Sequence, residues 1–417
     1  MDFNRIDFKL YVQHSISGTE GVMTIQTTAY ERPNPSFLER LTLVGRGTPM
    51  GELHRRYWHP VGLASDATAT PHQIRVLGED LILFRDGNGR AGLLYPRCAH
   101  RGASLYYGRV EDDGIRCCYH GWKFTVDGQC IDQPCEPNNG AATCRLVRQP
   151  YYPVKELYGL IFAYMGPPDK EPVLPRYDIL ENLAPGEFIE ADDKSIGTGG
   201  PIIVPCNWLQ HFENVMDPFH VPILHGSFSG NQFNAKMALM PRVKFEYTER
   251  GTRSIQLRDI EGGTHRRITE AVLPTIRAVA NPRADGDGPC TLLGWVLPID
   301  DTHFRIYSAG RVTQPGELAD IRSRYDGKFW QELTEEEHQK MPGDFESQVS
   351  QGDITLHSEE HLNSTDRGIS MLRRVYRDQL DAMEAGKDPM GVFFDPGREL
   401  VHLDAGTAIE PRKNSDP

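Results

Sequence analysis

The sequence predicts an α+β protein in which a small all-β domain precedes a larger domain of mixed helices and strands. Two apolar runs on either side of Asp86 to Gly89 predict a hairpin between His72 and Tyr95. Beyond Pro168 the apolar segments become longer, and the C-terminal part carries a helical pattern. We therefore expect an N-terminal arm at residues 1–45, the β domain at 46–165 and the α+β domain at 166–417.

Each further element has its own local signal. A second hairpin is predicted by Trp122–Val126 and the turn that follows at Asp127 and Gly128. A helix is expected from Asn207 to about Asp217, and apolar strands are expected at residues 243–247, 292–299 and 304–312. Apolar residues at three- and four-residue steps predict a last helix that ends near Gly386, and these are Ile369, Leu372, Tyr376, Leu380 and Met383.

The composition is that of a loop-rich globular enzyme with an acidic surface. The 417 residues carry a formal net charge of −13, which disfavours nucleic acid as a partner. No apolar run is long enough to cross a membrane, and no secretory signal is present, so we expect a cytoplasmic protein without a membrane partner. The 8 cysteines are too sparse for a disulfide scaffold, and most gather between residues 98 and 144, which favours metal binding.

Two cysteine–histidine pairs form the first metal motif. Cys98 and His100 are arranged as CxH, and Cys117 and His120 are arranged as CxxH. Two thiolates favour a ferric iron, whereas two imidazoles on the other iron raise its potential, and this asymmetric ligand set is that of a Rieske [2Fe–2S] cluster. A structural zinc site is the alternative, because two cysteines and two histidines also bind zinc.

Three features favour the iron–sulfur cluster over zinc. Histidine comes second in both pairs, His120 is followed by Gly121 and Trp122 as in Rieske domains, and a second metal motif lies downstream. We expect the neighbouring Cys118 to be a buried thiol rather than a ligand.

The second motif contains Asp217, His220 and His225, which form the pattern DxxHxxxxH typical of a mononuclear iron site. On a regular helix the two histidines would point about 140° apart. Both therefore face one metal only if the helix breaks between them, and Pro218 and Pro222 allow such breaks. Two histidines and one carboxylate form the facial triad that leaves Fe(II) open to O2, water and substrate.

Two polar residues near this motif receive other roles. We expect Asp217 to bind His220 by a hydrogen bond and not to bind the metal, although its position in the sequence would allow it. His211 lies outside the spacing, and we expect it to be a satisfied core residue.

Together the two motifs resemble the α subunits of Rieske non-haem iron oxygenases. The flanking segments at residues 47–60 and 359–369 are similar to the phthalate dioxygenase-like group, which includes aromatic O-demethylases. The resemblance implies a Rieske domain followed by a helix-grip domain, in which helices accompany an antiparallel sheet. It also implies a homo-oligomer, either a trimer or a hexamer, in which Asp217 bridges the cluster of one subunit to the iron of the next. Asn214 matches an asparagine beside that bridge.

The same resemblance implies an aspartate as the third iron ligand, shortly before a Gln-Gly segment. Asp344 matches that position, and Glu346 and Asp353 stay open as alternatives. The expected iron ligands are therefore His220, His225 and Asp344.

The resemblance implies a terminal oxygenase that uses O2 and NADH-derived electrons to oxidise an aromatic small molecule. The chain has no GxGxxG or other obvious nucleotide-binding motif, so a separate reductase, with or without a ferredoxin, must deliver the electrons. We expect O-demethylation of a lignin-derived methoxylated aromatic or biaryl carboxylate, with release of formaldehyde. Ring dihydroxylation or hydroxylation of an aromatic carboxylate is the alternative.

Two other classes of protein stay open at this stage. An electron carrier would hold the cluster without the second iron, and a zinc-stabilised binding protein would hold neither. Basic residues near the cluster offer an acidic redox partner a docking patch, and these are Arg97, Arg101, Arg109, Arg116 and Lys123. The sequence singles out none of the 45 lysines and arginines for a substrate carboxylate.

Overall fold

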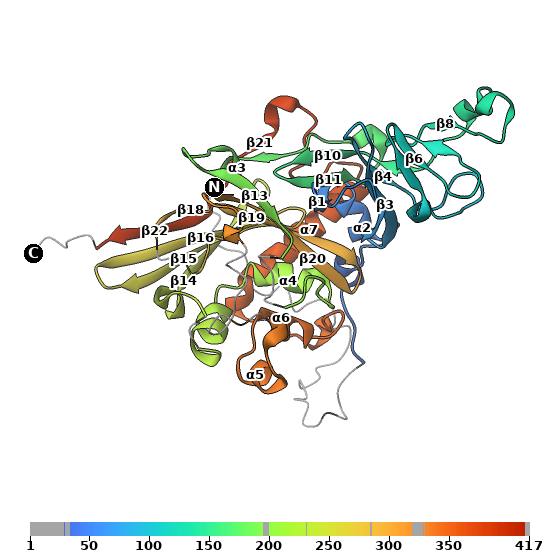
Figure 1. Cartoon of the computed structure of the whole chain (residues 1–417). Helices are drawn as coiled ribbons and strands as arrows, with labels where there is room; N and C mark the ends of the chain where they lie inside the picture. The colour runs from blue at the N-terminus through green and yellow to red at the C-terminus, as the bar shows by residue number, and fades with distance from the viewer. Residues whose placement is uncertain are drawn as a thin grey trace, which may run out of the picture.

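The computed structural model describes residue 29 and residues 34–194, 200–230, 232–283, 286–318, 328 and 330–412. Most of the predicted N-terminal arm lies outside the described residues. Its last part contains α1 (Glu39–Thr42), whose Leu41 is buried in the main core. Figure 1 shows a lobe of short strands, coloured blue to teal, that projects from a larger body.

Three small antiparallel sheets form the lobe, and the predicted hairpin is part of one of them. That sheet has the order β2 (His72–Val76), β3 (Glu79–Arg85), β4 (Ala91–Leu94) and β9 (Tyr151–Tyr152). The second has β1 (Trp58–Leu63), β11 (Leu160–Tyr164) and β10 (Val154–Leu157). The third contains the second predicted hairpin and has β5 (Arg109–Glu111), β6 (Gly114–Arg116), β7 (Lys123–Phe124) and β8 (Cys130–Asp132).

The body is built on a nine-stranded antiparallel sheet. Its main path is β13 (Phe188–Asp192), β20 (His303–Val312), β19 (Leu292–Asp300), β17 (Ile276–Ala278), β16 (Gly263–Val272), β15 (Gly251–Ile260) and β14 (Arg242–Thr248). The strands β18 (Gly288–Pro289) and β22 (Gly406–Pro411) complete it, and β12 (Arg176–Tyr177) pairs in parallel with β21 (Leu400–Val401) outside it. The predicted strands near 243–247, 292–299 and 304–312 are confirmed, whereas the polar strands β15 and β16 had no apolar signal.

Helices lie against this sheet and carry the predicted helical segments. The segment that begins at Asn207 forms α4 (Trp208–Asn214), and the Asn207 side chain caps it by accepting a hydrogen bond from the Leu209 amide at 3.0 Å. The predicted C-terminal helix is α7 (Arg367–Glu384), which buries Leu372, Tyr376 and Leu380. The other α-helices are α2 (Pro49–His54), α3 (Asp178–Glu181), α5 (Glu335–Lys340) and α6 (Asp344–Val349). Among the described helices, none has the length and apolarity needed to span a membrane.

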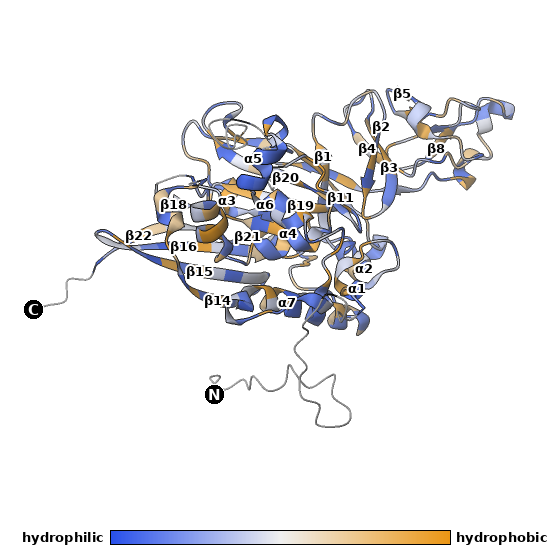
Figure 2. Ribbon diagram, turned by 90° about the horizontal axis from the view of Figure 1, so that it is seen from below, coloured by the Kyte–Doolittle hydropathy of each residue, from blue (hydrophilic) through white to orange (hydrophobic). Residues whose placement is uncertain are grey.

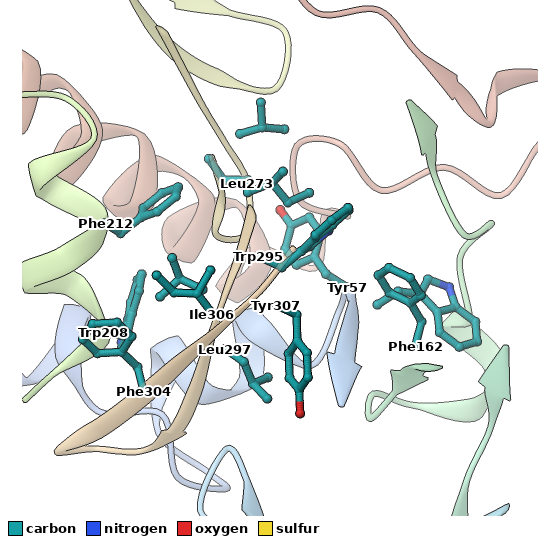
Figure 3. Packing of buried hydrophobic residues seen from close by; sticks show 14 of the residues in the cluster. Tyr57, Phe162, Trp208, Phe212, Leu273, Trp295, Leu297, Phe304, Ile306 and Tyr307 are labelled. Carbon is teal, nitrogen blue, oxygen red and sulfur yellow. The ribbon is translucent and has the colours of Figure 1, made fainter. Parts of the chain in front are cut away.

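One hydrophobic core joins the body to the near side of the lobe. Phe162 of β11 meets Trp295 of β19 in a T-shaped contact with ring centroids 5.7 Å apart, and Trp208 of α4 meets Tyr376 of α7 in the same way at 5.5 Å. Figure 3 shows Phe162, Trp208 and Trp295 among the packed side chains of this core. In Figure 2 much of the central sheet is orange, whereas the outer helix α5 is blue. A second, smaller core lies in the outer part of the lobe and contains Phe84, Ile115 and Phe124.

A buried ion pair connects α4 to α7. Arg373 donates to both carboxylate oxygens of Glu213, at 2.5 and 2.7 Å, and it also contacts Glu360 at 2.6 Å. Arg373 and Glu213 are 5% and 8% exposed, so neither charge has water as an alternative partner. Burial raises the pKa of Glu213, and Arg373 opposes that shift.

Replacing Arg373 with Ala should lower the free energy of unfolding by about 3–5 kcal/mol, because Glu213 would be left buried without its partner. The matched control is Arg374→Ala on the same helix, whose contact with Asp378 is long at 3.8 Å and solvent-exposed, and which should change stability by less than about 0.5 kcal/mol. Thermal and urea unfolding would measure both. Equal effects of the two substitutions would contradict a structural role for the buried pair.

Candidate metal centres

The four predicted cluster ligands lie on two loops at the outer end of the lobe. Cys98 follows β4 and Cys117 follows β6, and both are buried, at 4% and 3% exposure. Each cysteine carbonyl accepts a hydrogen bond from the amide of a glycine four residues later, Gly102 at 2.8 Å and Gly121 at 3.1 Å. Both glycines have positive φ angles, 76° and 70°, which other residues adopt only under strain. The two loops therefore present equivalent tight turns.

The histidines complete the same site from its outer side. The rings of His100 and His120 lie 4.6 Å apart between centroids, and Trp122 stacks on His100 at 4.4 Å with an interplanar angle of 6°. Both histidines are partly exposed, in contrast to the buried cysteines. A cluster held here would have its cysteine-bound iron inside and its histidine-bound iron near the surface.

Two polar groups of this site are destabilised in the absence of a metal. The Nδ1 atom of His100 is buried and has no hydrogen-bond partner in the described structure. Burial raises the pKa of the Cys98 thiol to about 12, and the Cys117 sulfur beside it contributes in the same direction. A metal that ionises both thiols and binds the orphaned imidazole nitrogen would satisfy these groups. The residues present thus fit a [2Fe–2S] cluster.

Two expectations about the surroundings of this site are wrong or weakened. Cys118 is exposed, because it points away from the loop core in which Cys117 is buried. Arg116 pairs with Glu111 at 2.8 Å and Asp132 at 2.7 Å, and Lys123 pairs with Glu111 at 3.0 Å. These two basic side chains are therefore neutralised internally and add little to a docking patch.

The second predicted site brings together three side chains from two distant segments. The ligand atoms of His220, His225 and Asp344 all lie within 4.8 Å of one another. The Nε2 atoms of His225 and His220 lie 3.3 and 3.6 Å from Oδ1 of Asp344. Burial opposes ionisation of Asp344, but the imidazoles of His225 and His220 hold its pKa well below the ordinary range. Two neutral nitrogens and an anionic oxygen around one point fit a facial-triad metal.

A π-helix produces this arrangement, and the predicted break in the helix is wrong. Residues Val221–Phe228 form a π-helix that follows directly on His220, with Pro222 in its first turn. In a π-helix the backbone hydrogen bonds join residues five apart, as in the bond from the Ser229 amide to the Leu224 carbonyl at 3.2 Å. Side chains five residues apart therefore return to nearly the same side. The wider turn, and not a break at proline, aligns His220 with His225.

A side chain from outside the three-residue group lies beside Nδ1 of each imidazole. Nδ1 of His225 lies 2.8 Å from Oε1 of Gln232, so it carries the proton and leaves Nε2 free to bind a metal. Nδ1 of His220 lies 3.4 Å from Oδ2 of Asp217, but this buried nitrogen has no hydrogen-bond partner among the described residues. The Asp217 carboxylate accepts instead from the backbone amides of Phe219 and His220, at 2.9 and 3.3 Å. The structure therefore places Asp217 beyond His220 and outside the three-residue group. Gln232 gave no signal in the sequence, because a lone glutamine seven residues after its histidine matches no motif.

Of the other predicted residues, Asn214 lies beside the three-residue group, whereas Glu346 and Asp353 lie outside it. The side-chain amide of Asn214 lies 3.1 Å from Oδ1 of Asp344 and 3.4 Å from Nε2 of His220, so it adjoins the ligand atoms. Glu346 instead caps its own helix by accepting from the Gly343 amide at 2.7 Å. Asp353 is not part of the three-residue group either. Of the three candidate carboxylates, only Asp344 lies with the two histidines.

His211 is a satisfied core residue, as its position suggests. Its Nε2 accepts a hydrogen bond from Arg277 at 2.8 Å, and its Nδ1 lies 3.0 Å from Oε1 of Gln348. Burial lowers the pKa of His211 to about 3, and Arg277 adds to this effect, so the ring is neutral. Arg277 and Gln348 are two further residues near the site that the sequence did not indicate.

A cavity opens directly onto the three-residue group. Its apolar wall includes Val215, Phe233, Met237, Val279 and Leu292. Its polar wall comes from β15, β16 and β17 and contains Gln256, Arg267, Thr269 and Arg277. A mostly apolar cavity with a few polar groups beside a metal-ligand set is the usual form of a site for a small organic molecule.

The fold and the two sites define an oxidoreductase with an iron–sulfur domain and a separate mononuclear metal centre. The Rieske [2Fe-2S] domain family matches residues 57–153. The chain is 51% identical over 373 residues to the phenoxybenzoate dioxygenase subunit alpha of Ectopseudomonas oleovorans, which covers 88% of this chain and 90% of that protein. It is 34% identical to the 5,5'-dehydrodivanillate O-demethylase oxygenase subunit of Sphingobium sp. (strain NBRC 103272 / SYK-6), covering 86% and 83%.

A solved structure shows the same fold at low sequence identity. The NdmA QL mutant of Pseudomonas putida CBB5 with caffeine superposes with a TM-score of 0.62 at 19% identity, covering 88% of this chain and 99% of that one. The chain belongs to the Rieske oxygenase α-subunit family. It is the terminal oxygenase component of a multicomponent system, with a Rieske cluster, a mononuclear iron, O2 as co-substrate and NADH through a partner reductase. The electron-carrier and zinc-protein alternatives are thereby excluded.

Asp344→Ala should remove the mononuclear iron and leave the cluster in place, so that the iron content falls from about three to about two atoms per chain. Iron analysis and the visible absorption of the cluster would measure the two sites separately. The matched control is Asp353→Ala, which should retain all the iron because Asp353 lies outside the ligand group. An unchanged iron content in Asp344→Ala would contradict its assignment as a ligand.

Proposed function

We propose that this protein oxidises an aromatic carboxylate at a carbon that carries an ether oxygen. The observation that supports this most directly is the group formed by His220, His225 and Asp344 beside a cavity with apolar walls. In this proposal these three residues bind Fe(II), and Cys98, His100, Cys117 and His120 bind the cluster.

The choice of an aryl ether rests on two relatives. One is named for phenoxybenzoate, a diaryl ether with a carboxylate, and the other is named for the O-demethylation of a biaryl carboxylate. Both names describe an aromatic acid with an oxygen substituent on the ring. The identity of 51% to the first, against 34% to the second, favours a diaryl ether over the methyl ether that the sequence analysis favoured.

Both reactions balance with one O2 and the two electrons of one NADH. Dioxygenation of the ether-bearing ring carbon and its neighbour adds both oxygen atoms and two hydrogens, and the resulting hemiketal collapses to a phenol and a catechol. Demethylation adds one oxygen atom to the methyl carbon, releases formaldehyde and a phenol, and sends the second oxygen atom to water. The products therefore distinguish the two candidates.

The protein side chains have separate roles in this proposal. When bound, the cluster supplies single electrons and Fe(II) supplies the site at which O2 is reduced. Gln232 holds the His225 imidazole with Nε2 toward the metal position, and the Asp217 carboxylate lies beside Nδ1 of His220. Phe233 packs on His225, with ring centroids 4.4 Å apart, and keeps water from that side of the cavity. Asn214 donates to the Asp344 carboxylate and thereby restricts its rotation.

We also propose that Asp217 connects this site to the cluster of a neighbouring subunit in a trimer or hexamer. The side chain of Asp217 is 28% exposed and lies on the outer side of His220, so a second chain can reach it. Figure 1 shows β6, which leads directly to Cys117, in the lobe and away from α4 and α6 of the same chain. A ferredoxin or its reductase as electron donor and a cytoplasmic location complete the proposal, and the 8 cysteines are all free thiols in this structure.

The substrate class can be tested by product analysis. The iron-loaded protein, NADH and a compatible reductase would be supplied with meta- and para-phenoxybenzoate and, separately, with methoxybenzoates. We expect one phenol released per O2 consumed with a phenoxybenzoate, and no formaldehyde. Formaldehyde equal to O2 with the methoxy compounds would favour demethylation, and O2 uptake without release of any phenol would contradict attack at the ether carbon. The Asp344→Ala protein is the inactive control.

Asp217→Ala should retain both metals yet slow the substrate-dependent oxidation of the reduced cluster by about 10- to 100-fold, because the link beyond His220 is lost. Stopped-flow absorption of the cluster would measure this rate, and iron analysis would measure the metals. Asp217→Asn keeps an acceptor for the His220 proton and should lie between the two. Normal cluster oxidation in Asp217→Ala would contradict the proposed connection.

A further inference from the structure

Three arginines are turned toward the interior from adjacent strands of the large sheet. Arg258 of β15 and Arg267 of β16 are 0% and 3% exposed, and Arg277 of β17 is half-buried. In the strand register Arg267 lies opposite Gln256, and Arg277 lies opposite Ala271. Because side chains alternate along a strand, Gln256, Arg258, Arg267 and Arg277 all lie on one face of the sheet. That is the face that lines the cavity.

None of these guanidinium groups forms an ion pair with a carboxylate of the described residues. Arg267 donates to the Ala280 carbonyl at 2.5 Å, and Arg277 donates to neutral His211 at 2.8 Å. Arg258 donates to the Leu239 carbonyl at 3.0 Å and to Gln256 at 3.1 Å, while its buried Nη2 atom has no partner. Buried charges are normally paired, because an unpaired one loses its hydration without compensation. An anion is therefore missing from this face.

Burial and the neighbouring positive charges lower the pKa values of the basic groups on this face. Burial lowers the pKa of Arg258 and of Arg267 to about 10, and Arg267 and Arg277 respectively add to these shifts. His265 stands opposite Arg258, and burial together with Arg258 and Arg267 lowers its pKa to about 4. It is therefore neutral at neutral pH and adds no further positive charge. Burial lowers the pKa of Arg277, and the nearby Asp344 carboxylate opposes that shift. The row of arginines therefore begins close to the three-residue group and continues into the sheet.

Arg267 is the arginine of this set best placed to hold a ligand. It lines the cavity together with Thr269 two residues along the same strand and Gln256 directly opposite. Arg277 also lines the cavity, but its contact with His211 already occupies part of its guanidinium group. Arg258 is not among the cavity-lining residues and lies behind Gln256, to which it donates. A planar, forked donor beside a hydroxyl and an amide suits a carboxylate.

We propose that Arg267, with Gln256 and Thr269 at its sides, binds the carboxylate of the aromatic substrate and so fixes which end of the molecule faces the metal group. This inference rests on the proposed function and adds a specificity-determining residue to it. The carboxylate supplies the anion that the buried arginines lack, and the ring lies against the apolar wall of Phe233, Met237 and Leu292. An uncharged analogue of the same shape leaves Arg267 unpaired and binds more weakly.

The test compares a charged and an uncharged ligand in a matched pair of variants. Isothermal calorimetry on the iron-loaded protein, without NADH or reductase, would measure the affinity for meta- and para-phenoxybenzoate and for the corresponding phenoxybenzamides. Arg267→Met should weaken binding of the phenoxybenzoate by about 100-fold and change binding of the amide by less than about 3-fold. Arg267→Lys keeps the charge without the forked geometry and should lose about 10-fold.

The matched control is Arg266→Met, one residue earlier on β16. Arg266 faces the opposite side of the sheet and pairs with Glu410 at 2.7 Å, so its loss should leave both affinities unchanged. Ligand-induced thermal stabilisation gives an independent readout, because phenoxybenzoate should stabilise the unsubstituted protein and Arg266→Met but not Arg267→Met.

The outcomes separate this inference from the proposed function. If the protein binds and cleaves a phenoxybenzoate, but Arg267→Met weakens the acid and the amide equally, the carboxylate anchor is wrong while the function stands. If Arg267→Met is selective for the acid and Arg267→Lys lies between, the anchor is supported. If the unsubstituted protein binds no aryl carboxylate, both are overturned.

Discussion

The metal-binding half of this molecule depends on the wide turn at residues 221–228. A π-helix brings two imidazoles five residues apart to the same carboxylate, which an α-helix would not do. Such a turn is rare, and contacts from outside support it here. Gln232 binds His225, Phe233 packs on the same ring, and the Ser229 hydroxyl donates to the Pro342 carbonyl at 2.6 Å. The last contact joins the end of the π-helix to Pro342, two residues before α6. Asp344 is the first residue of α6.

The third ligand is positioned by contacts that cross the whole body. The Gln210 side chain on α4 donates to the carbonyls of Gln348 and Gly352, at 2.9 and 3.1 Å, and so fixes α6 against α4. Glu213 on the same helix pairs with Arg373 on α7. Buried ion pairs add little net stability, but they allow few alternative arrangements. The helix α4 therefore contacts both α6, which carries Asp344, and α7.

The two functional ends of the molecule share a physical feature, since each contains buried polar groups that lack a full set of partners among the described residues. At the lobe these are the paired thiols of Cys98 and Cys117 and the orphaned nitrogen of His100. At and behind the cavity they are Arg267 and Arg258, which have no carboxylate partner among the described residues. Such groups lower the stability of the folded chain unless a ligand binds, and functional sites commonly accept this cost. In our proposal the [2Fe–2S] cluster completes the first set and a substrate carboxylate completes the second.

The sequence alone predicts those features that depend on residues close together along the chain, namely the metal motifs and the local helices and hairpins. The predicted cluster ligands lie on two short loops, and the pattern at 217–225 lies on one continuous segment, so the spacing of these residues along the chain indicates the chemistry directly. The hairpin at 72–95 and the helix at 367–384 follow from local periodicity. Only the tertiary structure separated Asp344 from Glu346 and Asp353, because His225 and Asp344 are 119 residues apart and α6 turns one carboxylate inward. It also decided the π-helix, the exposure of Cys118 and the burial of Arg267 beside the cavity. Alternating polar residues on a strand resemble a solvated face, and only the packing of the sheet against the cavity shows that this face is buried.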